Sequence, residues 1–175
     1  MDMKVCLYFK RSKLLSKSIL KEDIKEILSR FLEQVENDDH STNYFPPFYA
    51  GLELKVGFGF GNAAKIPWVA FLGKKQEPQN GIFPVYYFFK EYHRLILAYG
   101  LSEENRPEIS WQLTPIIKTI YTYFKERGKK PYKYGLSYVY KTYDVNKELD
   151  WIKIKEDIDA IIDKYKTILV NVTDD

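Results

Sequence analysis

The stretch that decides the fold is LELKVGFGFGNAAKIPWVAFLGKKQEPQNGIFPVYYFFKEYHRLILAYG, residues 52–100. Apolar residues occupy every second position of its first nine residues, which is the pattern of a half-buried β-strand. The dipeptide Asn80-Gly81 is a turn signal. Three further apolar or β-rich runs are bounded by turn residues, and they are 66–72, 83–89 and 94–100. The central third of the chain is therefore predicted to be a sheet of about four strands.

Amphipathic helices are predicted on both sides of this sheet. Residues 18–37 place apolar side chains at helical spacing. A second helix is expected to begin at Thr114-Pro115, with Thr as N-cap and Pro in the first helical position, and to end at Gly128. Asp150 is predicted to cap a last helix, whose inward residues are Ile154, Ile158, Ile161, Ile162, Tyr165 and Leu169.

The remaining segments are predicted to be a short N-terminal strand and loops. Residues 3–9 alternate like a strand, residues 37–51 contain Pro46-Pro47 and are expected to form a loop, and residues 129–143 form a basic aromatic loop that runs into an extended segment. We find no internal repeat. The predicted fold is a single α+β domain with a mixed central β-sheet and flanking α-helices. We expect residues 1–20 to be an N-terminal extension and residues 21–170 to be the domain.

Composition sets the general class of protein. The chain has 175 residues, of which 45% are hydrophobic, so a globular core is expected. No apolar run approaches the roughly 20 residues of a membrane span, and the start does not resemble a secretion signal. The single cysteine, Cys6, cannot form an internal disulfide. A cytoplasmic protein without a membrane partner is expected.

Charge and aromatic content allow two interpretations. The formal net charge is only +3, yet four lysines and one arginine fall within residues 125–133, and aromatic residues reach 17%. Tyrosine beside lysine in loops can stack on bases and neutralise phosphates. An ordinary core beside a solvated basic loop has the same composition. Composition alone therefore does not distinguish a nucleic-acid-binding surface from an ordinary solvated surface.

Motifs for nucleotide, metal and catalytic chemistry are absent from the sequence. The glycines of GFGFGN, residues 57–62, follow one predicted strand and precede another, whereas a phosphate cradle needs a helix there. This segment is either a plain hairpin bend or a loop that approaches a ligand and presents Phe60 at its tip. His40 and His93 lie far apart, so neither a metal site nor a catalytic triad is predicted. On its own, Trp68 in an apolar strand is typical of a core residue.

The order of many short motifs resembles the N-terminal domain of McrB, the recognition and GTPase subunit of the McrBC restriction endonucleases. The resemblance extends from about residue 20 to 168. The motifs that carry it are Gly59-Phe60-Gly61-Asn62, Ile66-Pro67-Trp68, Asn80-Gly81-Ile82-Phe83-Pro84-Val85, Leu97-Ala98-Tyr99-Gly100, Trp111-Gln112, Lys133-Tyr134-Gly135 and Asp163-Lys164-Tyr165-Lys166.

The resemblance implies a domain that binds duplex DNA and flips a 5-methylcytosine, preceded by a purine, into an aromatic pocket. It implies a base pocket of Trp68, Phe83, Tyr87 and Tyr134, with the base held between faces that include Trp68 and Tyr134. Phe60 then fills or supports the space vacated in the duplex. Contacts to the DNA backbone are expected from Lys129, Lys130, Lys133, Asn62 and Lys65.

The resemblance also sets expectations for partners and cofactors. No catalytic residue, metal or cofactor is expected in this chain, because GTP and Mg²⁺ belong to a motor domain and cleavage to the McrC nuclease subunit. The family pattern has Tyr at the positions of Phe60 and Phe83 and Leu at that of Tyr87, which puts the base preference in doubt. A reader of another modified or unmodified nucleic acid, and a protein-interaction module, remain alternatives.

Overall fold

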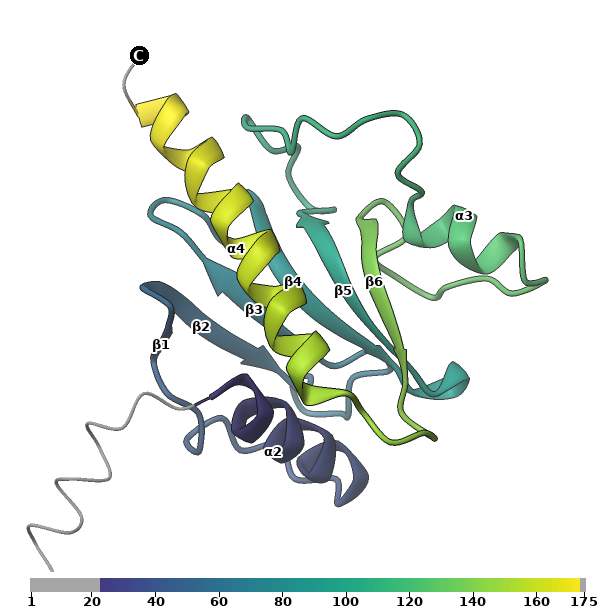
Figure 1. The fold of residues 1–175 in the computed structure, drawn as a ribbon. Helices are drawn as coiled ribbons and strands as arrows, with labels where there is room; N and C mark the ends of the chain where they lie inside the picture. Colours follow the sequence, from purple (N-terminus) through teal and green to yellow (C-terminus); the bar gives the residue numbers. More distant parts are fainter. Residues whose placement is uncertain (1–22, 174–175) are drawn as a thin grey trace, which may run out of the picture.

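A computed structural model describes residues 23–173, and a six-stranded sheet forms its centre (Figure 1). The strands lie in chain order, each paired with the next. They are β1 (Phe48–Tyr49), β2 (Leu52–Gly57), β3 (Trp68–Leu72), β4 (Ile82–Phe89), β5 (Arg94–Leu101) and β6 (Tyr138–Asp144). The helices are α2 (Ile24–Glu36), α3 (Ile120–Lys125) and α4 (Trp151–Thr173), with a short 3₁₀ turn, η1 (Lys90–Tyr92).

The predicted single α+β domain is confirmed, and its sheet differs in one respect from the mixed sheet expected. All pairings between the six strands are antiparallel. Most of the connections are short, and short turns can join only antiparallel neighbours. Within residues 23–173 the one parallel pairing is an isolated bridge between Asn80 and Asn105.

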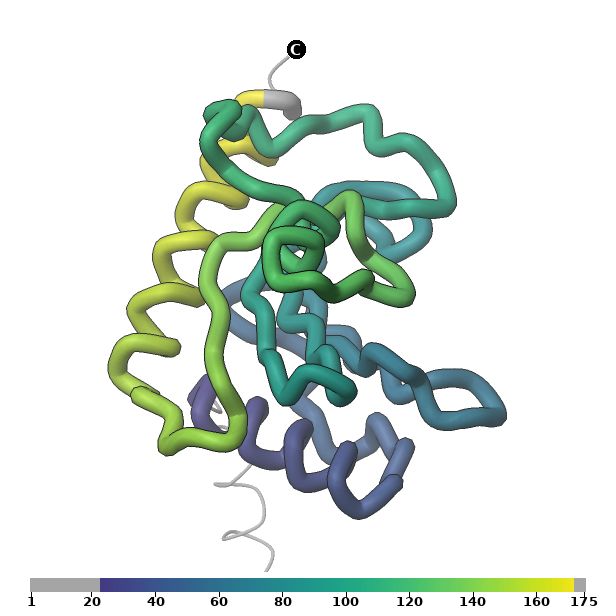
Figure 2. Tube along the Cα trace, turned by 90° about the vertical axis from the view of Figure 1, so that its right-hand side faces the viewer, coloured from purple at the N-terminus to yellow at the C-terminus, as the bar shows by residue number. Residues whose placement is uncertain are grey.

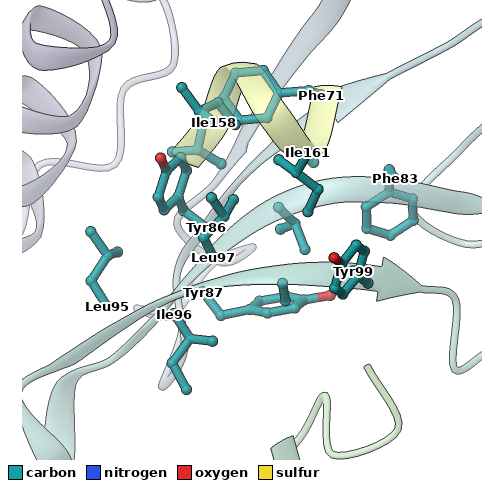
Figure 3. Packing of buried hydrophobic residues seen from close by; sticks show 14 of the residues in the cluster. Phe71, Phe83, Tyr86, Tyr87, Leu95, Ile96, Leu97, Tyr99, Ile158 and Ile161 are labelled. Atoms are coloured by element: carbon teal, nitrogen blue, oxygen red, sulfur yellow. The ribbon is translucent and has the colours of Figure 1, made fainter. Parts of the chain in front are cut away.

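The helix α4 covers one face of the sheet (Figure 1). Its buried side chains recur at helical spacing, as predicted, and pack on the strands. Figure 3 shows Ile158 and Ile161 beside Phe71 and Tyr86. The Tyr165 hydroxyl accepts a hydrogen bond from the Gly73 amide (3.0 Å) and donates one to the Ile82 carbonyl (2.8 Å), which ties the helix to β3 and β4.

The first strand lies at the edge of the sheet beside β2, and the first helix contacts α4. Asp23 caps α2 by accepting a hydrogen bond from the Ile24 amide at 2.7 Å. The segment 37–51, predicted as a loop, contains the short strand β1. Ala50 and Gly51 both have positive φ (49° and 79°), which is the conformation of a tight two-residue hairpin turn, so β1 folds directly back onto β2. The expected strand at residues 3–9, Cys6 and the boundary at residue 20 lie outside the described residues.

The prediction for α3 was wrong at its start. The helix begins at Ile120, with the Thr119 side chain accepting a hydrogen bond from the Thr122 amide (3.1 Å). The preceding residues pair with β6 instead: the Lys118 carbonyl accepts a hydrogen bond from the Val139 amide at 2.9 Å, and Thr119 forms a bridge with Tyr138. Pairing with a strand therefore replaces the first helical turns expected from Thr114-Pro115.

Candidate functional site

The candidate site lies on the face of the sheet away from α4. Side chains along a strand point alternately to the two faces, and Figure 3 shows Tyr86 directed toward α4 and its neighbour Tyr87 directed away. Trp68 of β3 is the cross-strand partner of Tyr87, and Phe83 lies four residues before Tyr87 on the same face. The sheet therefore presents three aromatic side chains on one surface. In Figure 2 the loops that precede β3 and that follow β5 project on this side.

These three residues and Tyr134 line one small cavity, of about 80 Å³, which we call the aromatic slot. Phe83 and Tyr87 are buried, whereas Trp68 and Tyr134 are partly exposed at its opening. Tyr134 comes from the loop after α3. The structure thus brings together all four residues that the sequence suggested for a base pocket.

Tyr134 covers the slot. Its ring stacks on the ring of Tyr87, with a centroid distance of 4.3 Å and an interplanar angle of 16°. Burial raises the pKa of Tyr134, and a hydrogen bond from the Trp68 indole to its hydroxyl acts in the opposite direction. The rings that face each other in this structure are therefore those of Tyr87 and Tyr134, and Trp68 contacts the Tyr134 hydroxyl.

Neighbouring residues fix the positions of Tyr87 and Trp68 in the slot. Burial raises the pKa of Tyr87, and its hydroxyl also forms a hydrogen bond with the Ser137 side chain, which lowers it. Ser137 is fully buried and accepts a hydrogen bond from the Leu101 amide at 3.2 Å. The Trp68 indole lies directly over Gly57, where an added Cβ would be 2.3 Å from the indole ring. The walls of the slot are therefore set by packing, and Tyr134 forms its partly exposed side.

The sequence interpretation missed Glu103, which lies just after β5 and lines the slot. Its carboxylate accepts hydrogen bonds from the Tyr134 amide (3.1 Å) and the Leu136 amide (3.0 Å). Tyr134 has a φ of 63°, in the region that favours glycine. Thirty-one residues separate Glu103 from Tyr134, and no local motif links them. Only the return of β6 alongside β5 brings the two segments together.

A larger cleft, of about 670 Å³, opens beside the slot. Phe89 lines the cleft two residues after Tyr87 on the same strand face, and the two ring centroids are 6.4 Å apart. The Lys65 ammonium lies 4.2 Å from the centroid of the Tyr132 ring, which joins the loop before β3 to the loop after α3. The other charged and aromatic residues of the cleft are Lys90, Glu91, Tyr92 and Lys130.

The remaining predicted lysines lie at the edges of these two cavities. Lys129 lies over the Tyr92 ring at 4.6 Å from its centroid, and the Tyr92 hydroxyl donates a hydrogen bond to the Lys130 carbonyl at 3.1 Å. Lys133 lies 5.2 Å from the centroid of the Tyr134 ring. The basic loop therefore borders both cavities. The cleft residues Lys90 and Tyr92 were not identified from the sequence, because η1 was not predicted. Tyr132 lies in the predicted basic aromatic loop but was not singled out.

Phe60 lies at the tip of an exposed loop between β2 and β3. The strand ends at Gly57, and Phe58 is the last inward residue, stacked on Phe31 of α2 with a centroid distance of 5.6 Å. Phe60 is fully exposed (104%), so the alternative in which it is the last core residue of the strand is excluded. Asn62 is also exposed, and its carbonyl lies 2.2 Å from the place of a Cβ on Gly59, so the tight loop requires glycine there.

Neither a metal cluster nor a membrane-spanning helix is found within residues 23–173. This part of the chain contains no group of three or more His, Cys, Asp or Glu side chains placed to hold a metal ion. None of the helices in the described part is both long and apolar enough to cross a membrane.

Comparison with known proteins identifies the family. A family model described as MrcB-like, N-terminal domain matches residues 47–127. The chain is also 40% identical, over 150 residues, to the Type IV methyl-directed restriction enzyme EcoKMcrB subunit of Escherichia coli (strain K12). This chain carries an MrcB-like N-terminal domain. The match covers 84% of the chain and 33% of the relative, so the chain spans about a third of the length of that protein.

The family model covers part of the candidate site. The family model covers β1 through α3, and therefore the loop of Phe60 and the three slot residues that the sheet contributes, Trp68, Phe83 and Tyr87. Tyr134 and the basic loop follow the matched region directly.

Proposed function

We propose that this MrcB-like domain binds duplex DNA on the face opposite α4 and flips a 5-methylcytosine, in a purine-methylcytosine context, into the aromatic slot. The observation that carries the proposal is the convergence of Trp68, Phe83, Tyr87 and Tyr134 on one cavity beside a lysine-lined cleft. The slot supplies stacking surfaces for a base, and the cleft supplies positive charge for the strand that leads to it.

Base entry requires Tyr134 to leave Tyr87. A cavity of about 80 Å³ is well below the roughly 300 Å³ of the smallest usual ligand pockets. Flipping costs a few kcal/mol of lost pairing and stacking, and stacking on aromatic side chains returns about 1–3 kcal/mol per base. The base takes the place of the Tyr134 ring on Tyr87, and Tyr134 closes over the base from the outside. With the base bound, Tyr134 again closes the slot, which then contains one more stacked ring than in the free domain.

The DNA backbone and the vacated position in the duplex have separate partners. Lys65 and Lys130 line the cleft, Lys129 and Lys133 lie beside it, and Asn62 lies on the loop of Phe60. These residues contact phosphates and position the duplex without reading its sequence. Phe60 is exposed on a loop that turns tightly at Gly59, and it enters the base stack in place of the extruded base.

In the whole system, the domain is a targeting module of a McrBC-type restriction system in the cytoplasm. This part of the proposal rests on the family match and on the relative's description as a methyl-directed restriction enzyme subunit. Recognition belongs to this domain. Cleavage requires a GTPase motor domain, with its GTP and Mg²⁺, and the McrC nuclease subunit. The domain itself performs no catalysis.

The experiment that tests the proposal uses four duplexes that differ at one position, carrying cytosine, 5-methylcytosine, 5-hydroxymethylcytosine or N6-methyladenine. Affinity is measured over a series of salt concentrations. We expect tightest binding to 5-methylcytosine and a steep loss of affinity with salt, because phosphate contacts release counterions. Binding that ignores both salt and modification contradicts the proposal and favours a protein-interaction module.

A different modified base is a second candidate, and Tyr87 is the observation that favours it. Its ring is buried and hydrogen-bonded to Ser137, and a base stacked on this ring would place its C5 substituent along the ring surface. Burying one methyl group contributes about 0.8 kcal/mol, so this contact gives only a several-fold preference. We predict that Tyr87→Leu changes the order of preference in the four-duplex panel more than the overall affinity. An unchanged order would place the C5 substituent elsewhere.

A further inference from the structure

Glu103 differs from an ordinary surface carboxylate in the hydrogen bonds that it accepts within the site. It is exposed, and it lies beside a loop whose proposed partner is polyanionic DNA, where a negative charge weakens phosphate binding. Both of its carboxylate oxygens nevertheless accept backbone amides of the loop that carries Tyr134. Hydrogen bonds to a charged acceptor are stronger than neutral ones. The carboxylate therefore restrains this short segment of backbone at two points.

The restrained segment contains the backbone of Tyr134. The φ of 63° at Tyr134 is unfavourable for a residue with a side chain, so the backbone keeps it only because its surroundings hold it. Glu103 supplies two of these restraints, and the Gly135 carbonyl supplies a third by accepting a hydrogen bond from the Tyr121 amide of α3 at 3.0 Å. The Tyr134 side chain is partly exposed, and its ring contacts are stacking on Tyr87, one hydrogen bond from Trp68 and the Lys133 ammonium at 5.2 Å. Rotation of the side chain breaks these contacts without moving the backbone.

We propose that Glu103 is a positioning residue that fixes the backbone of Tyr134 over the aromatic slot, so that only the Tyr134 side chain moves when a base enters. The inference rests on the proposed function, because it assigns a role in base flipping. In this role Glu103 contributes to base flipping and to discrimination between bases. It does not contribute to the attraction of DNA, because its charge is negative. A backbone held in place lets the ring return to the same position after the base has entered.

A matched control lies next along the chain. The carboxylate of Glu104 is also exposed, and among the described residues it accepts no hydrogen bond from the segment 134–136. Both carboxylates raise the pKa of Tyr134 through their charge, after the larger effect of burial, so both act on the same region electrostatically. Glu103→Gln and Glu104→Gln each remove one negative charge. Only Glu103→Gln replaces one of the two acceptors by an amide nitrogen that donates and cannot accept.

The first measurement needs no DNA. Hydrogen exchange of the Tyr134 and Leu136 amides is followed by NMR in the wild-type domain and in both variants. We expect exchange of these amides to become roughly five- to tenfold faster in Glu103→Gln, which corresponds to the loss of one or two ordinary hydrogen bonds. Glu104→Gln should leave them unchanged. Unchanged exchange in Glu103→Gln would overturn the inference.

The second measurement concerns base flipping. A duplex with 2-aminopurine as the purine that precedes the target 5-methylcytosine reports extrusion by a rise in fluorescence, because the extruded base no longer stacks on it. The affinity ratio of methylated to unmethylated duplex reports discrimination. We expect the fluorescence rise and the affinity ratio to fall several-fold in Glu103→Gln, because the loosened backbone no longer returns the Tyr134 ring to one position. Both should stay at the wild-type level in Glu104→Gln. Affinity for unmethylated duplex should change equally in the two variants, because both remove the same charge.

The outcomes separate this inference from the proposed function. If the wild-type domain binds and flips but the two variants behave alike, the role of Glu103 is wrong and the proposed function stands. If the wild-type domain gives no fluorescence rise with any duplex, the proposed function fails, and the role of Glu103 in flipping fails with it. The exchange measurement then still decides whether Glu103 holds the Tyr134 backbone.

Discussion

Phe60 is a single exposed side chain, and its role can be tested without disturbing the fold. A core phenylalanine truncated to alanine costs about 3–5 kcal/mol, but the Phe60 ring contributes no buried surface. We expect Phe60→Ala to leave the melting temperature nearly unchanged, to weaken binding to duplex DNA, and to abolish the fluorescence rise of 2-aminopurine placed next to the target base. Thermal melting and the fluorescence titration are measured on the same preparation. Full retention of the fluorescence rise would show that another residue supports the flipped state.

Tyr86 and Tyr143 form a matched pair for stability. The Tyr86 hydroxyl is buried and has no hydrogen-bond partner in the described structure, whereas the Tyr143 hydroxyl donates to the Asp157 carboxylate at 2.9 Å. A buried unpaired polar group costs about 1–3 kcal/mol. Tyr86→Phe is therefore expected to leave the free energy of unfolding unchanged or to raise it by about 1 kcal/mol. Tyr143→Phe should lower it by roughly 1–3 kcal/mol, because Asp157 is 3% exposed and loses its hydroxyl partner.

Urea denaturation of both variants checks this prediction. A loss of stability in Tyr86→Phe as large as that in Tyr143→Phe would mean that the Tyr86 hydroxyl has a partner, such as a buried water.

Individual slot residues were predictable from the sequence only where a resemblance assigned them. Trp68, by its own context, is typical of a core residue, and the structure shows it half-buried over Gly57. Phe83 and Tyr87 look like ordinary alternating strand residues. Glu103 could not be predicted, because its two hydrogen bonds join segments that are far apart in the chain and depend on backbone amides, which carry no sequence signal.

The loop between α3 and β6 carries the proposed phosphate contacts as a unit. Lys129, Lys130 and Lys133 are exposed and border the cleft and the slot. We predict that alanine substitutions there weaken methylated and unmethylated duplexes about equally. Removing one lysine–phosphate interaction should reduce the slope of log affinity against log salt by about one. The salt series of the single and triple variants checks this. Loss of methyl discrimination with an unchanged slope would assign these lysines to the slot instead.

Elements with strong periodicity were predictable, and those decided by long-range pairing were not. The strands β2 to β5 and the helix α4 lie close to where alternation and helical spacing predict them. The start of α3 was predicted too early, although Thr114-Pro115 is a good local start signal, because the backbone of Lys118 pairs with β6. The strand β1 was missed, since its two residues follow Pro46-Pro47 and form a strand only by pairing with β2.

The domain as a whole is predicted to act without nucleotide or metal. The motifs expected for binding either one are absent from its sequence, and the proposed contacts involve only side chains and backbone of this chain. We expect affinity for the methylated duplex to be the same with and without GTP, and to survive treatment with a chelator. Binding isotherms under the three conditions decide this. A strict requirement for either ligand would contradict the assignment of recognition to this domain alone.

The strand order of the sheet has a consequence for how the molecule assembles. Because every strand pairs with the next one along the chain, β1 to β5 can form by successive hairpins, each of which closes a short loop at little entropic cost. Pairing of β6 must instead close the whole excursion of residues 102–137, which is the slowest closure in the sheet. Glu103 and Tyr134 stand near the two ends of that excursion. The proposed recognition surface is therefore expected to form last during folding, after β1 to β5 have paired. It is also expected to lose its structure first when the domain begins to unfold.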